Sequence, residues 1–386
     1  MPSVTISSRG EQRIRGGHPW IYRADVTGVD AAGGDVVDVI GPRARPIGTA
    51  LFSDQSQITI RMLTVGDAQD VRALVRARLA RAIAFRASLA LDATAYRLVH
   101  GEADLLPSLV VDRYAEYVVL QTLSQGMDRL APVVVEALTE LLHPTGILAR
   151  NDPKVRALEG LPQRIDVLAG EIPDSLVVRE GPVDYAVDLR HGQKTGLFLD
   201  QRENREAAAR YARGRLLDCF SYHGGFGLRL APFCQSVEAV DISAEAVARI
   251  AANAARNGLT TLHAREANVF DELRRLERAG ERYDTIVLDP PAFAKNKASI
   301  PNAAAGYKDI NLHAMRLLAP GGTLVTCSCS YNISEAMFGD ILHEASVDSR
   351  VPVTVLEKRM QGRDHPVLMG VPETYYLKCF ILRRVE

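Results

Sequence analysis

The second half of the sequence alternates short apolar runs with helical patterns, and this alternation restricts the chain to an α/β fold. Five apolar runs follow one another from residue 215 onward: RLLDCF, VEAVDIS, HAREANVF, YDTIVLDPP and GGTLVTCSC. VPVTVLE and TYYLKCFILRR complete a set of seven predicted strands. Helical stretches separate the strands, and one of them has Ser243 as its predicted N-cap and Gly258 at its predicted end. Strands that alternate with helices form a mostly parallel sheet covered on both faces.

Polar residues end four successive predicted strands, at the edge where open α/β sheets bind ligands. They are Asp218, Asp241, Asn268 and Asp289. Asp241 follows Asp218 by 23 residues, which suits a carboxylate that accepts hydrogen bonds from ribose hydroxyls. The turn between them reads GGFG and lacks the G-x-G-x-x-G dinucleotide fingerprint. The set therefore indicates a nucleoside cofactor without a pyrophosphate, and S-adenosylmethionine is the candidate.

A doubled proline, Pro290 and Pro291, follows Asp289 directly. Proline cannot donate a main-chain hydrogen bond or continue a central strand, so the pair predicts a rigid corner. Such a corner can hold the edge of a planar substrate against the carboxylate. The alternative interpretation is a plain strand terminator.

The first half of the chain predicts two further parts. Residues 1–68 carry short apolar runs broken by DAAGGD and GPRARP, which is typical of a small all-β module. Residues 69–180 begin with a helix at 70–88 and continue as a mixed α/β segment, and residues 181–386 form the third part. One face of the helix is predicted to carry Arg72, Arg76, Arg78, Arg81 and Arg86. This face is either a stripe that contacts nucleic-acid phosphates or a solvated surface.

Composition limits the remaining function classes. Hydrophobic residues make up 47% of the 386 residues and charged residues 24%, as in an ordinary globular protein. The N-terminus lacks a signal peptide and no apolar run approaches a membrane span, so we expect a cytoplasmic protein without a membrane partner. The five irregularly spaced cysteines do not form a disulfide framework. A net charge of -1 gives no overall electrostatic signal for nucleic acid.

Several stretches resemble the class I methyltransferases that make 5-methylcytosine in large-subunit (23S) ribosomal RNA. The similar motifs are VDLRHGQKTGLFLDQRENR, FSYHGGFG, LDPPAFAKNK, GYKDIN, GGTLVTCSCS and DHPV, in this order. GHPWIYRADV is similar to the start of the family's PUA domain, and YRLVHGEADLLPSLVVDRY to its central domain. The resemblance implies a PUA-like RNA-binding domain, a small α/β central domain and a Rossmann-like methyltransferase domain of seven strands, the last one antiparallel.

The resemblance also implies a site that holds S-adenosylmethionine and ribosomal RNA, with no metal and with homodimer formation left open. Cys329 is implied as the nucleophile and Asp289 as a second catalytic residue. His223 and Asn268 stand where the family usually has Thr and Asp, although an amide oxygen can still accept from an adenine amino group. The predicted cofactor-binding residues are Asp218, Tyr222, Gly224, Gly225, Phe226, Asp241, Ser243, Asn268 and Asp289. The predicted RNA-binding residues are Lys194, Pro290, Pro291, Phe293, Lys295, His365, Arg72, Arg76 and Arg81.

Cytosine chemistry gives a reason for a thiol at this edge. C5 of cytosine is a poor nucleophile until a group adds at C6, and a thiolate is the side chain best suited to that addition. Asp289 is placed to hold the N3 edge of the base and to offset the charge that develops there. Cys327 and Cys329 lie on the same side of a strand, so either fits this role by position. The alternative interpretation of Cys327, Cys219, Cys234 and Cys379 is a buried small hydrophobe, and no second pair at zinc spacing accompanies the CxC.

Two other functions remain open. One is a methyltransferase acting on an adenine or guanine amino group, because DPPAF is close to the proline corner of such enzymes. Phe293 comes one residue late for that pattern, and the chemistry has no use for Cys329. The other is a non-catalytic RNA-binding protein with a degenerate methyltransferase domain, against which the intact Asp218, Asp241 and Asp289 count.

Overall fold

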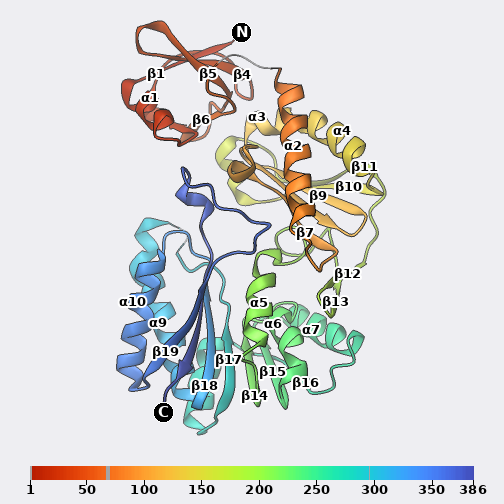
Figure 1. Cartoon of the computed structure of the whole chain (residues 1–386), viewed down its shortest axis with the longest axis vertical. Coiled ribbons are helices and arrows are strands. Elements are labelled where there is room, and N and C mark those ends of the chain that lie inside the picture. The colour runs from red at the N-terminus through yellow and green to blue at the C-terminus, as the bar shows by residue number, and fades with distance from the viewer. Residues whose placement is uncertain (1, 67–69, 295) are drawn as a thin grey trace. The chain divides into compact units, whose positions relative to one another are not determined.

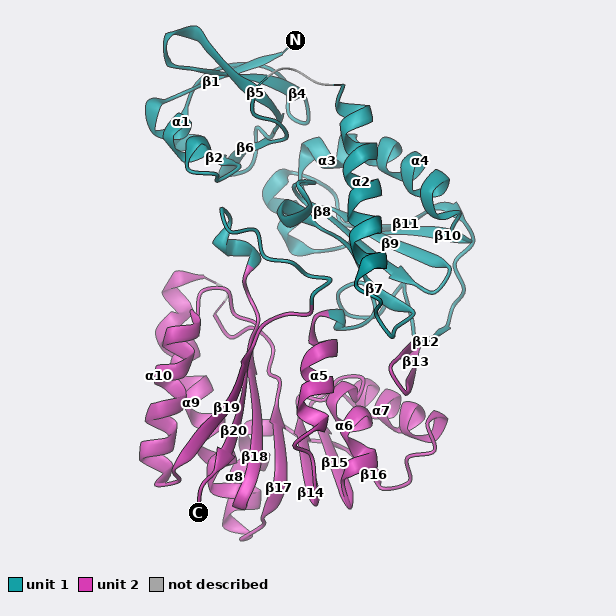
Figure 2. Ribbon diagram, viewed as in Figure 1, with its two compact units in different colours: residues 1–178, 187–199, 363–374 teal, residues 179–186, 200–362, 375–386 magenta. Residues whose placement is uncertain are grey.

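The computed structural model describes residues 2–66, 70–294 and 296–386, and these form two compact units (Figures 1 and 2). Unit 1 comprises residues 1–178, 187–199 and 363–374, and unit 2 comprises residues 179–186, 200–362 and 375–386. The first two predicted parts therefore fall almost wholly in unit 1, together with two segments of the predicted third part. Lys295, a predicted RNA contact, lies outside the described residues.

The first part of unit 1 is a six-stranded sheet whose inward residues, such as Val4 and Ile60, form a closed apolar core. The prediction of an all-β module is wrong in one respect, because helix α1 (Ser8–Arg15) follows the first strand. The Ser7 hydroxyl accepts from Gly10 N and caps this helix, and Ile14 is buried in the core. The strands are β1 Ser3–Ile6, β2 Trp20–Tyr22, β3 Val26–Asp30, β4 Val36–Gly41, β5 Arg45–Phe52 and β6 Ile58–Met62, in the order β2-β6-β5-β4-β1-β3.

The second part of unit 1 packs helices α2 (Val71–Ser88), α3 (Gln125–Arg129) and α4 (Ala131–Leu142) on a five-stranded sheet. The prediction of one arginine face on α2 is wrong for two of its five arginines. Arg78 and Arg86 are buried, because they bind partners within unit 1. The strands are β7 Ala95–His100, β8 Leu109–Tyr114, β9 Tyr117–Thr122, β10 Gly146–Asn151 and β11 Arg164–Gly170, in the order β11-β10-β9-β8-β7.

Unit 2 is built on the predicted seven-stranded sheet, in the order β16-β15-β14-β17-β18-β20-β19 (Figure 1). β20 runs antiparallel to both of its neighbours, which confirms the expected antiparallel final strand. A separate two-stranded sheet pairs β12 (Leu176–Glu180) with β13 (Val183–Val187). The seven strands are β14 Arg215–Cys219, β15 Ser236–Asp241, β16 Leu262–Glu266, β17 Tyr283–Leu288, β18 Leu318–Ser328, β19 Val353–Arg359 and β20 Lys378–Arg384.

Helices cover both faces of this sheet, as predicted. On one face, α8 (Val269–Arg278), α9 (Ile300–Leu317) and α10 (Glu335–Ser349) share a core with alternate strand residues such as Leu217 and Cys219. On the other face, Gly227 of α6 (Gly225–Leu230) packs against Val237. The remaining helices of the unit are α5 (Arg202–Ala209) and α7 (Ala244–Arg256), and Ser243 caps α7 as predicted. None of the described helices has the length and hydropathy needed to cross a membrane.

The four strands that carry the predicted site residues are parallel to one another. β14 pairs with β15 and β17, and β17 pairs with β18. Their carboxyl ends therefore meet at one edge of the sheet, so Asp218, Asp241, Asp289 and Cys329 lie at or directly after neighbouring strand ends.

Candidate active site at the carboxyl edge of the sheet

Asp218 is buried and accepts hydrogen bonds from residues of the turn between β14 and α6. Its Oδ2 accepts from the Ser221 hydroxyl at 2.5 Å and from Gly227 N at 2.9 Å. Burial raises the pKa of Asp218 to about 7, although both hydrogen bonds oppose the rise. A Cβ at Gly227 would lie 2.9 Å from the same oxygen, so this position needs glycine. Asp218 therefore stabilises the turn between β14 and α6 through hydrogen bonds inside the turn.

The backbone of this turn is strained at two non-glycine residues. Phe220 and Tyr222 have φ angles of 62° and 52°, and Gly224 has a φ of 82°. Left-handed conformations cost an L-residue roughly 1–2 kcal/mol, and they persist where a binding site requires the backbone path. The predicted cofactor residues Gly225 and Phe226 begin α6, so the strained turn delivers its N-terminal N–H groups to the sheet edge.

Asp241 has the geometry of a ligand carboxylate. It ends β15 and is half-buried. Its Oδ2 accepts from Tyr222 N at 2.9 Å and its Oδ1 from Ser243 N at 3.0 Å. Because each oxygen of a carboxylate has two acceptor sites, both can still accept from ribose hydroxyls. The donor and acceptor set at this edge therefore fits the nucleoside part of S-adenosylmethionine. Ser243 itself is used as the helix cap, since its hydroxyl accepts from Ala246 N.

The two positions that depart from the family pattern have specific roles. Asn268 is exposed, and its Oδ1 accepts from Phe270 N, capping α8. An adenine amino group would share this oxygen with the helix. His223 is buried, which lowers its pKa to about 3, so the ring is neutral at physiological pH. It packs edge-on against Tyr222 with ring centroids 4.0 Å apart, and it therefore supports the turn by packing without adding charge.

Asp289 lies half-buried after β17 and is held by a residue that the sequence analysis did not single out. Gln201 is buried, and its Nε2 donates to Asp289 Oδ1 at 2.8 Å. Asn204 Nδ2 donates to Gln201 Oε1 at 2.7 Å and fixes the amide orientation. Gln201 stands in the QRENR part of a motif that carries the resemblance, which was its only signal in the sequence.

Cys329 follows the end of β18 and remains half-buried. Its Sγ donates to the Pro290 carbonyl at 3.7 Å, which places the thiol beside the proline corner. The Ser330 hydroxyl accepts from Ala294 N at 3.1 Å and ties the same two loops together. Cys329 and Asp289 therefore lie in adjacent loops that are joined by hydrogen bonds.

Cys327 has a different environment, although it lies only two residues away. It is fully buried and faces Cys379 on β20. Burial, followed by the neighbouring Cys379 and Asp289, raises the pKa of the Cys327 thiol well above its usual value. A thiol of this kind is a poor nucleophile, so the interpretation of Cys327 as a buried small residue fits the structure.

The other residues predicted at the proline corner differ in their exposure to solvent. Pro290 is buried and Pro291 is exposed. The Phe293 ring lies 4.6 Å from the Tyr307 ring and 5.9 Å from the Phe270 ring, within an aromatic cluster. Phe293 is thus used for packing between the proline corner and the helices α8 and α9.

The remaining predicted RNA-binding residues belong to unit 1. Lys194 is exposed, and its Nζ lies 4.3 Å from the centroid of the Phe198 ring. Arg72 and Arg76 form ion pairs with Glu136 and Glu140 of α4. Arg81 is exposed on α2.

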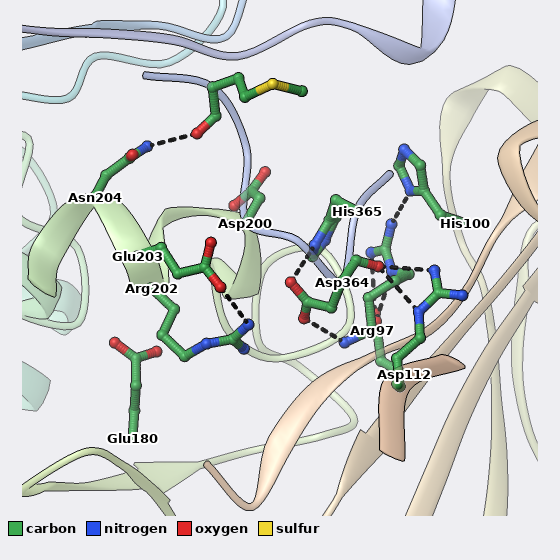
Figure 3. Close-up of polar contacts among 12 residues, drawn as sticks. Arg97, His100, Asp112, Glu180, Asp200, Arg202, Glu203, Asn204, Asp364 and His365 are labelled. Carbon is green, nitrogen blue, oxygen red and sulfur yellow. Dashed lines mark hydrogen bonds and ion pairs between the residues drawn. The ribbon is translucent and has the colours of Figure 1, made fainter. Parts of the chain in front are cut away.

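His365 is buried in a polar cluster of unit 1 (Figure 3). Its Nδ1 is hydrogen-bonded to Asp364 Oδ1 at 3.1 Å, and its ring packs edge-on against His100. The Asp364 Oδ2 accepts from Arg97 N at 2.9 Å. The Arg97 guanidinium in turn binds Asp112, with Nε and Oδ1 2.6 Å apart. The segment 363–374 is therefore anchored to β7 through this cluster, and a contact of His365 with RNA stays a prediction.

Fold and site together are those of an S-adenosylmethionine-dependent methyltransferase. Residues 161–371 match the S-adenosylmethionine-dependent methyltransferase family, and residues 4–65 match the PUA-like domain. Two solved structures share the fold over 99% of this chain and 100% of theirs, at 21% identity: a methyltransferase complexed with SAH (TM-score 0.86) and an S-adenosylmethionine-dependent methyltransferase from Streptococcus mutans (TM-score 0.85).

Similar proteins of known name extend over almost the full length of the chain. The chain is 40% identical to ribosomal RNA large subunit methyltransferase I of Shewanella amazonensis, over 98% of both chains. It is 38% identical to the protein of the same name from Tolumonas auensis, over 99% of both chains. The chain therefore belongs to the ribosomal RNA large subunit methyltransferase I family, and its cofactor is S-adenosylmethionine.

Proposed function

We propose that this protein forms 5-methylcytosine in large-subunit (23S) ribosomal RNA, with Cys329 as the nucleophile, in the cytoplasm. The names of the relatives support the RNA substrate, and the PUA-like match supports an RNA-binding module. The choice of cytosine C5 depends on one observation, the half-buried Cys329 thiol beside the Pro290 carbonyl at the cofactor edge of the sheet. Amino-group methylation has no role for a thiol at this place.

The reaction begins when the Cys329 thiolate adds to C6 of the cytosine. As the S–C6 bond forms, the C5=C6 π electrons move into a C4=C5 bond and the C4=N3 π electrons move onto N3. C5 thereby becomes a nucleophilic enamine carbon. Asp289, held by Gln201, faces the N3 edge and in its protonated form donates to the nitrogen where charge develops. S-adenosylmethionine, when bound, supplies the methyl group that C5 takes. The C5 proton then passes to water, the C5=C6 double bond re-forms as the S–C6 bond breaks to return the Cys329 thiolate, and N3 returns its proton to Asp289.

Trapping with 5-fluorocytosine tests this proposal. In RNA that carries 5-fluorocytosine at the target, fluorine cannot leave C5 as a proton does, so the thiol cannot be eliminated. We expect a denaturant-resistant adduct between protein and RNA that forms only with S-adenosylmethionine. Cys329→Ser should abolish the adduct, because a serine hydroxyl is far less ionised and less nucleophilic.

Cys327→Ser is the matched control, since it changes the neighbouring thiol two residues earlier in the chain. We expect this variant to retain the adduct. Methylated RNA without any adduct would instead indicate an amino-group methyltransferase, and neither product nor adduct would indicate a non-catalytic RNA-binding protein. An adduct that survives Cys329→Ser and disappears with Cys327→Ser would show that the nucleophile is assigned to the wrong cysteine.

A further inference from the structure

Lys378 is a buried lysine at the start of β20, and the next four residues of this strand are apolar. Only 2% of the residue is exposed. Its Nζ donates to the Ser330 carbonyl at 2.6 Å and to the Tyr376 carbonyl at 2.9 Å. Within the described parts of the chain, no carboxylate forms an ion pair with this ammonium group. Two neutral carbonyls therefore account for two of its three N–H donors.

Lys378 contacts the residues on either side of the proposed nucleophile, Cys329. Its Cα pairs with Ser328 across the β18–β20 ladder, and its Nζ binds the carbonyl of Ser330. Cys329 lies between these two residues in the chain. Burial lowers the pKa of Lys378 to about 8, and the charge of Cys329 acts in the opposite direction. Lys378 is therefore a cation at pH 7, and it interacts electrostatically with the thiol.

Stability alone does not explain a lysine here. Moving an ammonium group out of water costs several kcal/mol in a real protein, even after local relaxation. A residue such as methionine would fill a similar volume in this apolar strand without that cost. Buried ionisable groups with strongly perturbed pKa values concentrate at functional sites, and Lys378 contacts the loop that carries Cys329.

Three described groups near Cys327 and Cys329 supply no positive charge that would favour a thiolate. The Pro290 carbonyl accepts the hydrogen bond of the S–H group and so stabilises the thiol. Tyr307 of α9 is a buried phenol whose pKa is raised by burial, so it stays uncharged. Asp289, at the end of β17, acts on Cys327 by raising its pKa. An ammonium group on β20 offsets these effects, because a nearby cation lowers a thiol pKa.

We propose that Lys378 is a positioning residue that holds Cys329 as a thiolate, with its third N–H directed to the sulfur. This inference rests on the proposed function and deepens it. In the free protein the Cys329 thiol gives its proton to water. The thiolate and the Lys378 ammonium group then form an ion pair before the RNA binds. This role requires no contact of Lys378 with the base or the cofactor.

Alkylation of Cys329 as a function of pH tests the proposal without RNA or cofactor. Iodoacetamide labelling of the full chain, read at the Cys329 peptide by mass spectrometry, separates this thiol from the other four cysteines. We expect wild-type Cys329 to reach half of its maximal rate below the ordinary thiol value of about 8.5. In Lys378→Met the half-maximal pH should move upward by about one unit, which slows labelling at pH 7 about tenfold. Lys378→Arg should restore part of the shift.

Lys358→Met is the matched control, because it removes an exposed lysine from the adjacent strand β19. Its Cys329 labelling should equal that of the wild type. A wild-type half-maximal pH at or above about 8.5 would overturn the proposal even if Lys378→Met does not fold. An unshifted profile in a folded Lys378→Met protein would also overturn it. Since labelling needs no RNA, failure of the 5-fluorocytosine adduct alone would instead count against the proposed function.

Discussion

Asp218 and Asp241 end neighbouring strands, but their surroundings give them different roles. Asp218 is buried, uses one oxygen for two hydrogen bonds within the turn, and has a pKa raised to about 7. Asp241 is half-buried, and each of its oxygens accepts a single backbone N–H. Only Asp241 therefore combines exposure with spare acceptor sites for ligand hydroxyls.

Asp241→Ala should weaken the binding of S-adenosylmethionine, because ribose hydroxyls lose charge-assisted acceptors that contribute roughly 1.5–3 kcal/mol. Isothermal calorimetry should show a dissociation constant about ten to a hundred times larger. Asp241→Asn keeps an acceptor for the turn and should cause a smaller loss. Asp271→Ala, at an exposed position of α8, is the control and should leave the affinity unchanged. Equal affinity of Asp241→Ala and wild type would remove this carboxylate from the cofactor site.

Helix α2 uses its arginines in two ways at the scale of an element. Arg78 donates to the Leu63 and Leu105 carbonyls, which lie in segments before and after the helix. Arg86 binds both oxygens of Asp104 and also donates to the Asp364 carbonyl at 2.8 Å. The helix therefore joins the central sheet and the late segment 363–374 within unit 1.

Arg86→Met should lower the free energy of unfolding of unit 1 by about 3–5 kcal/mol, because it leaves Asp104 without its buried partner. Urea denaturation followed by the fluorescence of Trp20, the single tryptophan of the chain, measures this change. Arg81→Met, at an exposed position of the same helix, should change the free energy by no more than about 0.5 kcal/mol. Similar midpoints for the two variants would show that the Arg86 contacts add little stability.

At the scale of the whole molecule, the proposed chemistry lies in one unit and the predicted arginine contacts with RNA lie in the other. Cys329, Asp289 and Asp241 belong to unit 2, whereas Arg72, Arg76 and the PUA-like strands belong to unit 1. A net charge of -1 makes the binding of RNA a matter of local surfaces. Binding and catalysis should therefore respond to different substitutions.

Changing Arg72, Arg76 and Arg81 together to Gln should weaken the binding of target RNA. It should also flatten the dependence of log affinity on log salt by up to about 2, the value for three contacts to single-stranded phosphates. Electrophoretic mobility shifts at several salt concentrations measure both effects. Cys329→Ser should keep wild-type affinity and slope. The control changes three exposed arginines of unit 2, Arg256, Arg278 and Arg282, to Gln. If the α2 variant keeps the wild-type salt dependence, these three arginines do not contact the RNA and form only a solvated surface.

Local sequence patterns were sufficient to predict the seven strands of the main sheet of unit 2. The apolar runs predicted all seven strands, and Ser243 was recognised as the cap of α7, because strand periodicity and capping depend on residues close together in the chain. Parallel strands also share one carboxyl edge, so the residues that end them could be assigned to a common site. Asp218, Asp241, Asn268 and Asp289 follow from these local rules, whereas the choice of Cys329 over Cys327 came from the family resemblance.

Burial was decided only by the tertiary structure. Cys327 and Cys329 look alike in TCSCS, yet Cys379 on β20 encloses one thiol while the other faces the proline corner. Lys378 binds the Ser330 carbonyl and Gln201 binds Asp289 across segments that are distant in the chain, so these two contacts could not be predicted from neighbouring residues. The sequence by itself therefore determined the seven strands and the sheet edge at which the candidate site lies. Which thiol can react, and which cation lies beside it, depends on contacts between distant segments, because desolvation is set by the packed neighbours of a group and not by its neighbours along the chain.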